Sequence, residues 1–481
     1  MFANDAGHHY REAVQKIFGG ARLRRLRDER GLTQLALARR LDLSASYVNQ
    51  LENDQRPLTL PVLLKLNSAF DLDANYFAGD EDARLLADLA EVFADEPGAP
   101  HVGAGELEDL VVRAPTAAHT LVAMHRRVRA MAEQLDRFQE GEDGYEGEER
   151  EDAGAPYEDV RDFFYDRRNH ILDLDLAAEA MFDAAGFEIG GLDRQLAEHL
   201  RSRYGVTVAM GEGPAKRHFD GPARVLTLAR RLSPGQRAFQ LATQLAFFTQ
   251  EDLIEAQLVD TDLAPQSRAL ARIGLANYFA GALILPYGEF LSAAEQTRYD
   301  IEVLASRFEV GFETVAHRLS TLQRPGRRGV PLFFVRIDRA GNISKRQSAT
   351  GFHFSRVGGS CPLWVVHEAF DSPGRIRTQI SAMPDGRSYF WLARTTDESS
   401  PGYLAPRRDF AIGLGCDLAH AHRLVYSHGV ALDDPDTAVP IGAGCKVCSR
   451  ADCAQRAFPQ LGRSLRIDEN EASRVPYTPA G

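Results

Sequence analysis

The run EGEDGYEGEEREDA, from Glu140 to Ala153, limits what this chain can fold into. Its only apolar residues are Tyr145 and Ala153, so it cannot bury enough surface to offset the entropy lost on ordering. We therefore expect residues 140–156 to form a solvated, flexible linker. The 481 residues are enough for about three domains of ordinary size. The chain needs no single core, and it is predicted to be multidomain.

The formal net charge of -12 hides an uneven distribution of charge. Residues 11–70 carry eleven Lys or Arg against six Asp or Glu, so the overall acidity does not argue against nucleic-acid binding by this segment. The start of the chain has no apolar run typical of a signal peptide. No later window approaches the roughly 20 apolar residues of a membrane span. We expect a cytoplasmic protein with no membrane partner.

Residues 20–78 have the pattern of a helix-turn-helix domain. Apolar residues recur at helical spacing in four short blocks, Gly31 fits a C-cap after the first block, and Thr33 and Ser44 fit N-caps. The pattern R-x-x-R…G-L-T-Q-x-x-L-A…S-x-S-Y-V-N-Q-L-E resembles the Cro/phage-repressor type. We predict an all-α DNA-binding domain over residues 1–79. The alternative is a small helical bundle with a solvated basic face.

The resemblance implies which residues meet double-stranded operator DNA. The third helix would enter the major groove with Val48 and Leu51 facing inward, and Gln34 would open the second helix beside a phosphate. Asn and Gln can pair bidentately with adenine, while arginines clamp the DNA backbone. The candidate DNA-contacting residues are Arg22, Arg25, Gln34, Ser44, Ser46, Tyr47, Asn49, Gln50 and Arg56.

Residues 80–139 are predicted to be a helical dimerisation segment. Apolar residues alternate at steps of three and four, a spacing that makes a narrow seam along one helix. They are Leu121, Met124, Val128, Met131, Leu135 and Phe138. Such a seam needs a partner, and a homodimer would place two recognition helices on a near-palindromic site. The alternative is packing against the middle domain of the same chain.

Residues 157–325 are predicted to form an α+β middle domain. A short strand, RVLTL, precedes a helix that Ser233 caps with Pro234 in its first turn. The ordered patterns R-x-F-x-x-A-x-x-L, A-N-x-F-A-x-x-L-x-x-P and L-A-x-R-F-x-V-x-x-x-x-V-x-x-R-L resemble the IrrE-like zinc peptidase domains. This resemblance implies a zincin-like fold.

The chain departs from that family at the metal site. Active members carry H-E-x-x-H, in which two histidines bind zinc and the glutamate acts as base. Here those positions are Thr243, Gln244 and Phe247, and Ile273, Gly274 and Leu275 stand where the acidic third ligand is expected. We expect a degenerate domain without peptidase chemistry, and therefore not an enzyme. The lost metal site leaves either a small-molecule pocket or a filled core.

Residues 326–481 are predicted to be an α+β sensor domain built around cysteines. Three cysteines form C-x2-C-x4-C, namely Cys445, Cys448 and Cys453, and a chain with five cysteines is unlikely to use them as a disulfide framework in the cytosol. Clustered soft ligands favour a metal. The other two cysteines, Cys361 and Cys416, each stand in a Gly-flanked stretch that is predicted to be a loop before a helix. Further candidates for a fourth ligand are His367, His420 and His422. The spacing leaves both an iron–sulfur site and zinc open.

Together these features resemble one family, the short-chain acyl-CoA-responsive bacterial regulators. The motifs that carry the resemblance are Y-V-N-Q-L-E-x-D-x-R-P-L-T, the degenerate middle domain, and G-S-C-P-L-W…H-E-A-F…G-C-x-V-C-x-R-x-x-C-x-Q-R-A-F-P. The resemblance implies control of methylcitrate-cycle, acetate or glyoxylate metabolism, with coenzyme A or a short-chain acyl-CoA as effector. It also implies a [4Fe-4S] cluster. Its expected ligands are Cys361, Cys445, Cys448 and Cys453, with Cys416 as the first substitute and zinc as the alternative metal.

The effector site follows from the chemistry of coenzyme A. Its phosphates need Arg or Lys, its adenine needs an apolar slot, and its acyl tail needs a closed apolar pocket. We expect these in the middle domain, at Arg167, Arg168, Thr243, Gln244, Phe247 and Phe248; the alternative is that the arginines are surface residues and the phenylalanines core residues. The resulting hypothesis is a DNA-binding regulator whose operator affinity depends on acyl-CoA. The alternative is a redox or iron sensor with a structural zinc or iron–sulfur site and no acyl-CoA effector.

Overall fold

The computed structural model describes most of the chain. The described residues are 20–53, 55–70, 85–86, 88–90, 92–93, 102, 104–139, 156–348, 360–396, 404, 409–446, 448–460, 465–467 and 470. The predicted linker, residues 140–156, lies outside them except for Pro156. The described residues divide into two compact units. The first comprises residues 1–90 and 102–122, and the second comprises residues 91–101 and 123–481.

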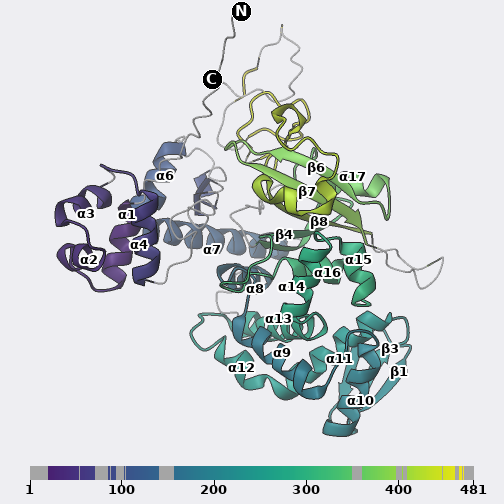
Figure 1. Ribbon diagram of the computed structural model, residues 1–481. Helices are drawn as coiled ribbons and strands as arrows, with labels where there is room; N and C mark the ends of the chain where they lie inside the picture. The colour runs from purple at the N-terminus through teal and green to yellow at the C-terminus, as the bar shows by residue number, and fades with distance from the viewer. Residues whose placement is uncertain are drawn as a thin grey trace, which may run out of the picture. The chain divides into compact units, whose positions relative to one another are not determined.

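The first unit contains the four predicted helices of the N-terminal domain (Figure 1). They are α1 (Gly20–Glu29), α2 (Gln34–Arg40), α3 (Ala45–Glu52) and α4 (Leu60–Phe70). The predicted caps are present, because the side chains of Thr33 and Ser44 accept hydrogen bonds from the backbone N–H groups of Ala36 and Tyr47. Gly31 has a positive φ of 62°, as a residue that ends a helix in the left-handed conformation does. The four apolar blocks meet in one core.

Two further helices follow, α6 (Ala104–Arg113) and α7 (Pro115–Gln139). Helix α7 carries the predicted dimer seam, and the described part of that seam faces solvent. Leu121, Met124 and Val128 are 37%, 61% and 63% exposed, whereas Val122 is buried. The side chains of Met131, Leu135 and Phe138 lie outside the described ones. Three residues in the described half of the seam are therefore exposed.

The second unit begins with the helices and small sheet of the middle domain (Figure 1). The helices are α8 (Pro156–Asp166), α9 (Leu172–Ala185), α10 (Leu192–Tyr204), α11 (Pro234–Thr249), α12 (Glu251–Ala256), α13 (Pro265–Ile284), α14 (Tyr287–Gln296), α15 (Ile301–Arg307) and α16 (Phe312–Leu319). The sheet has the order β1-β3-β2, from β1 (Thr207–Gly211), β2 (Arg217–Asp220) and β3 (Val225–Ala229). The predicted strand RVLTL is thus the central β3. Ser233 caps α11 in a reciprocal capping box with Gln236.

The C-terminal segment forms a six-stranded sheet of order β5-β4-β8-β7-β6-β9. The strands are β4 (Phe333–Asp338), β5 (Ile343–Ser348), β6 (Arg377–Ala382), β7 (Ser388–Thr395), β8 (Phe410–Asp417) and β9 (Val439–Pro440), and all pairs are antiparallel except β6 with β9. Helix α17 (Val365–Glu368) and 3-10 turns η1 (Ala369–Asp371), η2 (Leu418–Arg423), η3 (Val425–Ser427) and η4 (Pro435–Thr437) complete it. The described parts combine an all-α segment with mixed helix and sheet, as the α+β prediction requires.

Alternation along the strands gives this sheet two buried faces. Phe334 and Leu392 belong to the core of the middle domain, whereas Phe333 and Trp391 belong to a second core beside α17. One continuous core therefore runs across the predicted boundary near residue 325. Cys416 lies in strand β8 and its side chain belongs to the core of the middle domain. The prediction that it occupies a loop before a helix is therefore wrong, because its side chain points from a strand into a packed core.

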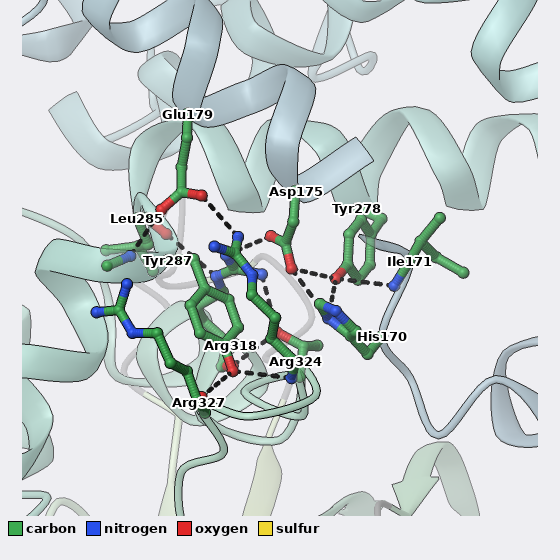
Figure 2. A network of polar contacts seen from close by, with 12 residues as sticks. His170, Ile171, Asp175, Glu179, Tyr278, Leu285, Tyr287, Arg318, Arg324 and Arg327 are labelled. Atoms are coloured by element: carbon green, nitrogen blue, oxygen red, sulfur yellow. Dashed lines mark hydrogen bonds and ion pairs between the residues drawn. The ribbon is translucent and has the colours of Figure 1, made fainter. Parts of the chain in front are cut away.

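A buried ion pair joins the helices of the middle domain (Figure 2). The carboxylate of Asp175 in α9 accepts two hydrogen bonds. One comes from Nη2 of Arg318 in α16 at 2.6 Å, and the other comes from the hydroxyl of Tyr278 in α13 at 2.9 Å. His170 Nδ1 lies 3.0 Å from the same carboxylate, and Tyr278 accepts from the N–H of Ile171. Although burial alone would raise the pKa of Asp175, Arg318 and His170 lower it below its usual value.

A second pair one helical turn along α9 extends this network. Glu179 accepts from Arg324 at 2.6 Å and from the N–H of Gly288 at 2.8 Å. The guanidinium of Arg324 lies 4.0 Å from the centre of the Tyr287 ring, and the Tyr287 hydroxyl donates to the carbonyl oxygen of Arg327. Helix α9 is thus bound through two carboxylates to α13, α14, α16 and the segment after α16.

Among the described residues no single helix is long and apolar enough to cross a membrane; one bent pair, α13 with α14, passes that test by length and composition alone.

We predict that Asp175→Asn destabilises the second unit by about 3–5 kcal/mol, because it leaves the charge of Arg318 buried without a counter-ion. Urea unfolding followed by tryptophan fluorescence measures this, since both tryptophans, Trp364 and Trp391, lie in this unit.

The matched control is Glu212→Gln, which breaks the exposed Arg230–Glu212 pair of the same 2.6 Å length. An exposed pair contributes less than about 1 kcal/mol, so this variant should unfold almost as the parent does. Equal losses in the two variants would contradict the assignment.

Candidate functional site

The exposed face of α3 carries four of the nine predicted DNA-contacting residues. Val48 and Leu51 are fully buried, as predicted, while Ser46 and Asn49 are exposed and Tyr47 and Gln50 are half-buried. Ser44 caps the helix, the guanidinium of Arg56 lies 5.6 Å from the Tyr47 ring centre, and the side chains of Arg22 and Arg25 lie outside the described ones.

Glu52, which sequence analysis did not select, holds this face together. It is 2% exposed, and its carboxylate accepts from Arg27 Nε at 2.7 Å and from Gln34 Nε2 at 2.6 Å. Gln34 also lies 3.4 Å from Asn49, so the second and third helices are fixed to each other by polar contacts. In the sequence, Glu52 directly follows Leu51, the last apolar residue of α3, and this position was a signal for a residue near the core. The apolar pattern does not predict that the glutamate itself is buried.

Four of the five cysteines line one small cavity. Its walls are Cys361, Pro362, Pro440, Gly442, Gly444, Cys445, Cys448, Arg450, Cys453, Gln455 and Arg456. A Cβ at Gly442 would lie 2.6 Å from the Sγ of Cys448, so glycine is required there for the loop to approach the thiol. Cys416 and the three candidate histidines are not part of this lining.

Hydrogen bonds shape the cysteine cavity. The backbone N–H groups of Gly442 and Leu363 bond to the sulfur of Cys361, and burial raises the pKa of this thiol despite them. Arg456 is 4% exposed and donates to the carbonyl oxygens of Cys445 and Cys448 at 2.9 and 3.0 Å. A buried cation therefore fixes the loop that presents the thiols. Among the described residues, no three His, Cys, Asp or Glu converge closely enough to hold a single metal ion.

A much larger cavity, of about 1240 Å³, lies in the second unit. Residues of α8, α11, α13, α15 and α16 line it together with β4, β5 and the end of β7. Eight of the lining residues are Lys or Arg and two are Glu. The cations are Arg161, Lys216, Arg231, Arg318, Arg336, Lys345, Arg346 and Arg394. We call this the cationic cavity.

Burial affects the ionisable groups of one wall. It lowers the pKa of His317 well below its usual value, with Lys345, Arg318 and Arg336 adding to the shift. It also lowers the pKa of Lys345 to about 8, where Glu313 opposes the change and Arg336 adds to it. At neutral pH this wall therefore presents a neutral imidazole among cations.

None of the six residues predicted for the effector site lines the cationic cavity. Thr243 and Gln244 are buried, and the Thr243 hydroxyl donates to the carbonyl oxygen of Phe239. Phe247 packs under Arg217, and Phe248 packs against Tyr204 and Phe219.

The two predicted arginines are also elsewhere. Arg167 donates to the carbonyl oxygen of Phe163 and covers its ring, while Arg168 is exposed with a positive φ. The cavity opens one turn earlier on α11, at Gln236, Phe239 and Gln240, because those residues face the C-terminal sheet. The cations of β4 and β5 belong to a segment whose sequence pattern predicts two strands and a turn but gives no sign of a binding site.

Three family models match consecutive parts of this chain. They are a helix-turn-helix model over residues 23–77, the IrrE N-terminal-like domain over 201–320, and the C-terminal domain of the short-chain fatty acyl coenzyme A regulators over 321–477. The chain is 60% identical to the HTH-type transcriptional regulator PrpR of Mycobacterium tuberculosis over 96% of each chain. The chain belongs to the short-chain fatty acyl coenzyme A regulator family.

Other relatives are similar over nearly their whole length. The chain is 48% identical to the HTH-type transcriptional regulator RamB of Mycobacterium tuberculosis and 43% identical to the propionyl-CoA carboxylase regulator of Cereibacter sphaeroides, in both cases over 96% of this chain and 99% of the relative. A solved Mycobacterium tuberculosis transcriptional regulator, 63% identical, covers 67% of this chain and 99% of its own with a TM-score of 0.66. The chain described above is therefore itself a helix-turn-helix transcriptional regulator, and we refer to it as this regulator.

In this regulator, residues at the positions where the IrrE-like pattern expects zinc ligands make close contacts of their own. A Cβ at Gly274, one of the positions where the IrrE-like pattern expects an acidic ligand, would lie 2.8 Å from the Phe164 ring of α8. A carboxylate there would require α8 to move. Gly274, Phe164 and Asn277 instead line the cationic cavity, which therefore lies beside the former metal site.

We predict that Gln50→Ala weakens binding to a cognate operator by about tenfold, with little effect on binding to random duplex DNA, because a base-edge contact carries sequence information. Arg56→Ala should weaken both equally and reduce the salt dependence, as loss of a phosphate contact does.

The operator comes from selection among random duplexes, and fluorescence anisotropy at several salt concentrations gives both affinities. Lys65→Met is the control, since Lys65 is paired with Asp42 and lies on α4. A Gln50 variant that loses specific and random binding in equal proportion would contradict the base-contact assignment.

Proposed function

We propose that this protein is a cytoplasmic regulator of propionate or acetate metabolism that binds operator DNA and responds to a short-chain acyl-CoA in the cationic cavity. The observation that carries the effector assignment is the excess of cations in that cavity: eight Lys or Arg line it against two Glu, and two further carboxylates, Glu158 and Asp175, pair with three of the eight. Cations gathered inside a cavity cost free energy unless anions offset them. Coenzyme A brings a pyrophosphate and a 3′-phosphate, which together can offset several of these charges.

The cavity also provides the other contacts that an acyl-CoA needs. Its volume of about 1240 Å³ is large enough for a ligand of this size. Phe164, Phe239 and Phe312 offer aromatic surface for the adenine or the acyl chain, and Gln236 and Asn277 offer amides for the pantetheine. The names of the relatives support the same metabolic role, since one of them is a propionyl-CoA carboxylase regulator.

We further propose that the four thiols of the cysteine cavity hold a [4Fe-4S] cluster. The donor set fits, because four cysteines line one cavity, Gly442 leaves room at Cys448, and two N–H groups bond to the sulfur of Cys361. Zinc held by the same four thiolates is the alternative metal. Bound there, the cluster would supply electron transfer or a structural cross-link. The chain's part is to hold the thiolates and to offset their charge with Arg450 and Arg456.

The exposed half of the seam on α7 supports a homodimer. Met124 and Val128 lie one turn apart, are more than half exposed, and would be covered by the same face of a second copy. Ligand binding would alter DNA affinity only if the DNA-competent arrangement of this dimer binds acyl-CoA differently.

The alternative function is a redox or iron sensor without an acyl-CoA effector. The cysteine cavity is compatible with it, but it leaves the cationic cavity without a role. We therefore favour the acyl-CoA-responsive regulator.

We predict that propionyl-CoA or acetyl-CoA raises the Tm of the full-length protein by several degrees, whereas S-propionyl pantetheine, which lacks the phosphates, does not. Differential scanning fluorimetry measures the Tm, and free propionate is the control. Equal shifts with both thioesters would show that the cations do not bind phosphate, and no shift with any of them would support the sensor alternative.

We predict that Gly442→Ala prevents cluster loading while preserving the fold, because the added methyl group lies 2.6 Å from Sγ of Cys448. Iron, sulfide and zinc analysis with visible absorption after anaerobic purification measures loading, with about four irons and four sulfides expected in the parent.

Gly221→Ala is the matched control, since no atom lies within 4 Å of the added Cβ. Colourless parent protein with one zinc per chain would overturn the cluster proposal and leave a structural metal site.

A further inference from the structure

The β4–β5 hairpin places two like charges directly opposite each other on one wall of the cationic cavity. Arg336 of β4 is paired in register with Lys345 of β5, and both side chains line the cavity. Like charges opposite each other in an antiparallel pair destabilise it. The hairpin therefore carries an unfavourable interaction that a bound anion would offset.

The groups around this pair compensate it only in part. Glu313 of α16 accepts from Arg336 at 3.0 Å, and Glu158 of α8 is shared between Arg161 and Arg346. Glu302 of α15 lies 3.4 Å from Arg394, and Arg318 is bound to Asp175. His317 completes the wall. Glu313 is thus hydrogen-bonded to Arg336 and attracts Lys345 electrostatically.

The other end of the hairpin contacts the cysteine site. Its turn contains Gly341, whose φ is 82° and whose carbonyl oxygen lies 3.3 Å from Ser360 Oγ. Ser360 Oγ lies 3.0 Å from Nε2 of His367 in α17, and His367 is hydrogen-bonded to the backbone of Cys361. A Cβ at Gly341 would lie 3.2 Å from the His367 ring. The turn, Ser360, His367 and Cys361 are therefore in continuous contact.

We propose that Arg336 and Lys345 form the subsite for the phosphates of the ligand, and that the β4–β5 hairpin transmits occupancy of this subsite to the Cys361 loop. The proposal rests on the acyl-CoA site described above. A phosphate between the two cations offsets their repulsion and favours the paired hairpin. The paired hairpin holds its turn against Ser360 and His367, and so favours one position of the Cys361 loop. Because coupling of this kind is reciprocal, the state of the cysteine site alters acyl-CoA affinity by the same factor.

Calorimetry tests the phosphate subsite. Lys345→Met should weaken propionyl-CoA binding at pH 7 by about tenfold, and Lys65→Met should have no effect. Because the pKa of Lys345 is about 8, the free protein loses most of this charge above that pH, and the parent should bind about fivefold more weakly at pH 9 than at pH 7. Lys345→Arg keeps its charge and should lose that part of the pH dependence.

Hydrogen exchange of the full-length protein tests the transmission. Propionyl-CoA should slow amide exchange in residues 333–348 and also in residues 360–368. Ser360→Ala should keep the first protection and lose most of the second, whereas Ser202→Ala, on the exposed surface of α10, should keep both.

The outcomes separate the two proposals. Absence of binding by calorimetry overturns the effector assignment and this inference with it. Binding that protects α11 and α13 but not residues 333–348 overturns the hairpin subsite alone. Protection of the hairpin with unchanged exchange in residues 360–368 of the parent overturns the transmission.

Discussion

The ion pair between Asp175 and Arg318 is the constraint on which the second unit depends. Both side chains are almost fully buried, and each would be costly without the other. Tyr278 and His170 satisfy the remaining lone pairs of the carboxylate, so the charge is paired and hydrogen-bonded rather than merely neutralised. Arg318 and Tyr278 also line the cationic cavity. The ion pair that joins α9, α13 and α16 therefore also fixes part of the wall of the candidate effector site.

The C-terminal sheet lies between the two candidate sites. One face, through Phe334 and Leu392, packs into the core beneath the cationic cavity, and the other, through Phe333 and Trp391, packs on α17 beside Cys361. A layer shared by two sites is a physical route for coupling, because close-packed interiors have low compressibility and transmit strain. The hairpin is the edge of this layer that contacts both sites through polar groups.

The middle domain matches the IrrE N-terminal-like domain but carries other residues where that pattern expects zinc ligands. Residues at the former ligand positions are buried in contacts of their own, as Thr243 is against Phe239 and Gly274 is against Phe164. Of these positions, Gly274 borders the cationic cavity, whereas Thr243 does not line it. The cavity lies beside them, where α11 and α13 face the hairpin, and its cations come largely from segments outside the peptidase motif.

Much of this protein was predictable from its sequence. Local interactions set the helix-turn-helix elements, so the caps at Thr33 and Ser44, the burial of Val48 and Leu51 and the capping box at Ser233 follow from neighbouring residues. The loss of H-E-x-x-H and the clustering of three cysteines were also local patterns.

Which cysteine and which cations join a site was decided by tertiary structure. Cys361 and Cys416 have similar glycine-flanked contexts, yet the first lines the cysteine cavity and the second is buried in β8. The register of β4 and β5 brings Arg336 and Lys345 together. Tertiary packing buries the carboxylates of Glu52 and Asp175, which then accept hydrogen bonds from several side chains. Short-range patterns specify elements and their faces. Contacts between residues far apart in the chain depend on how those faces pack, and that packing is where the sites of this regulator are made.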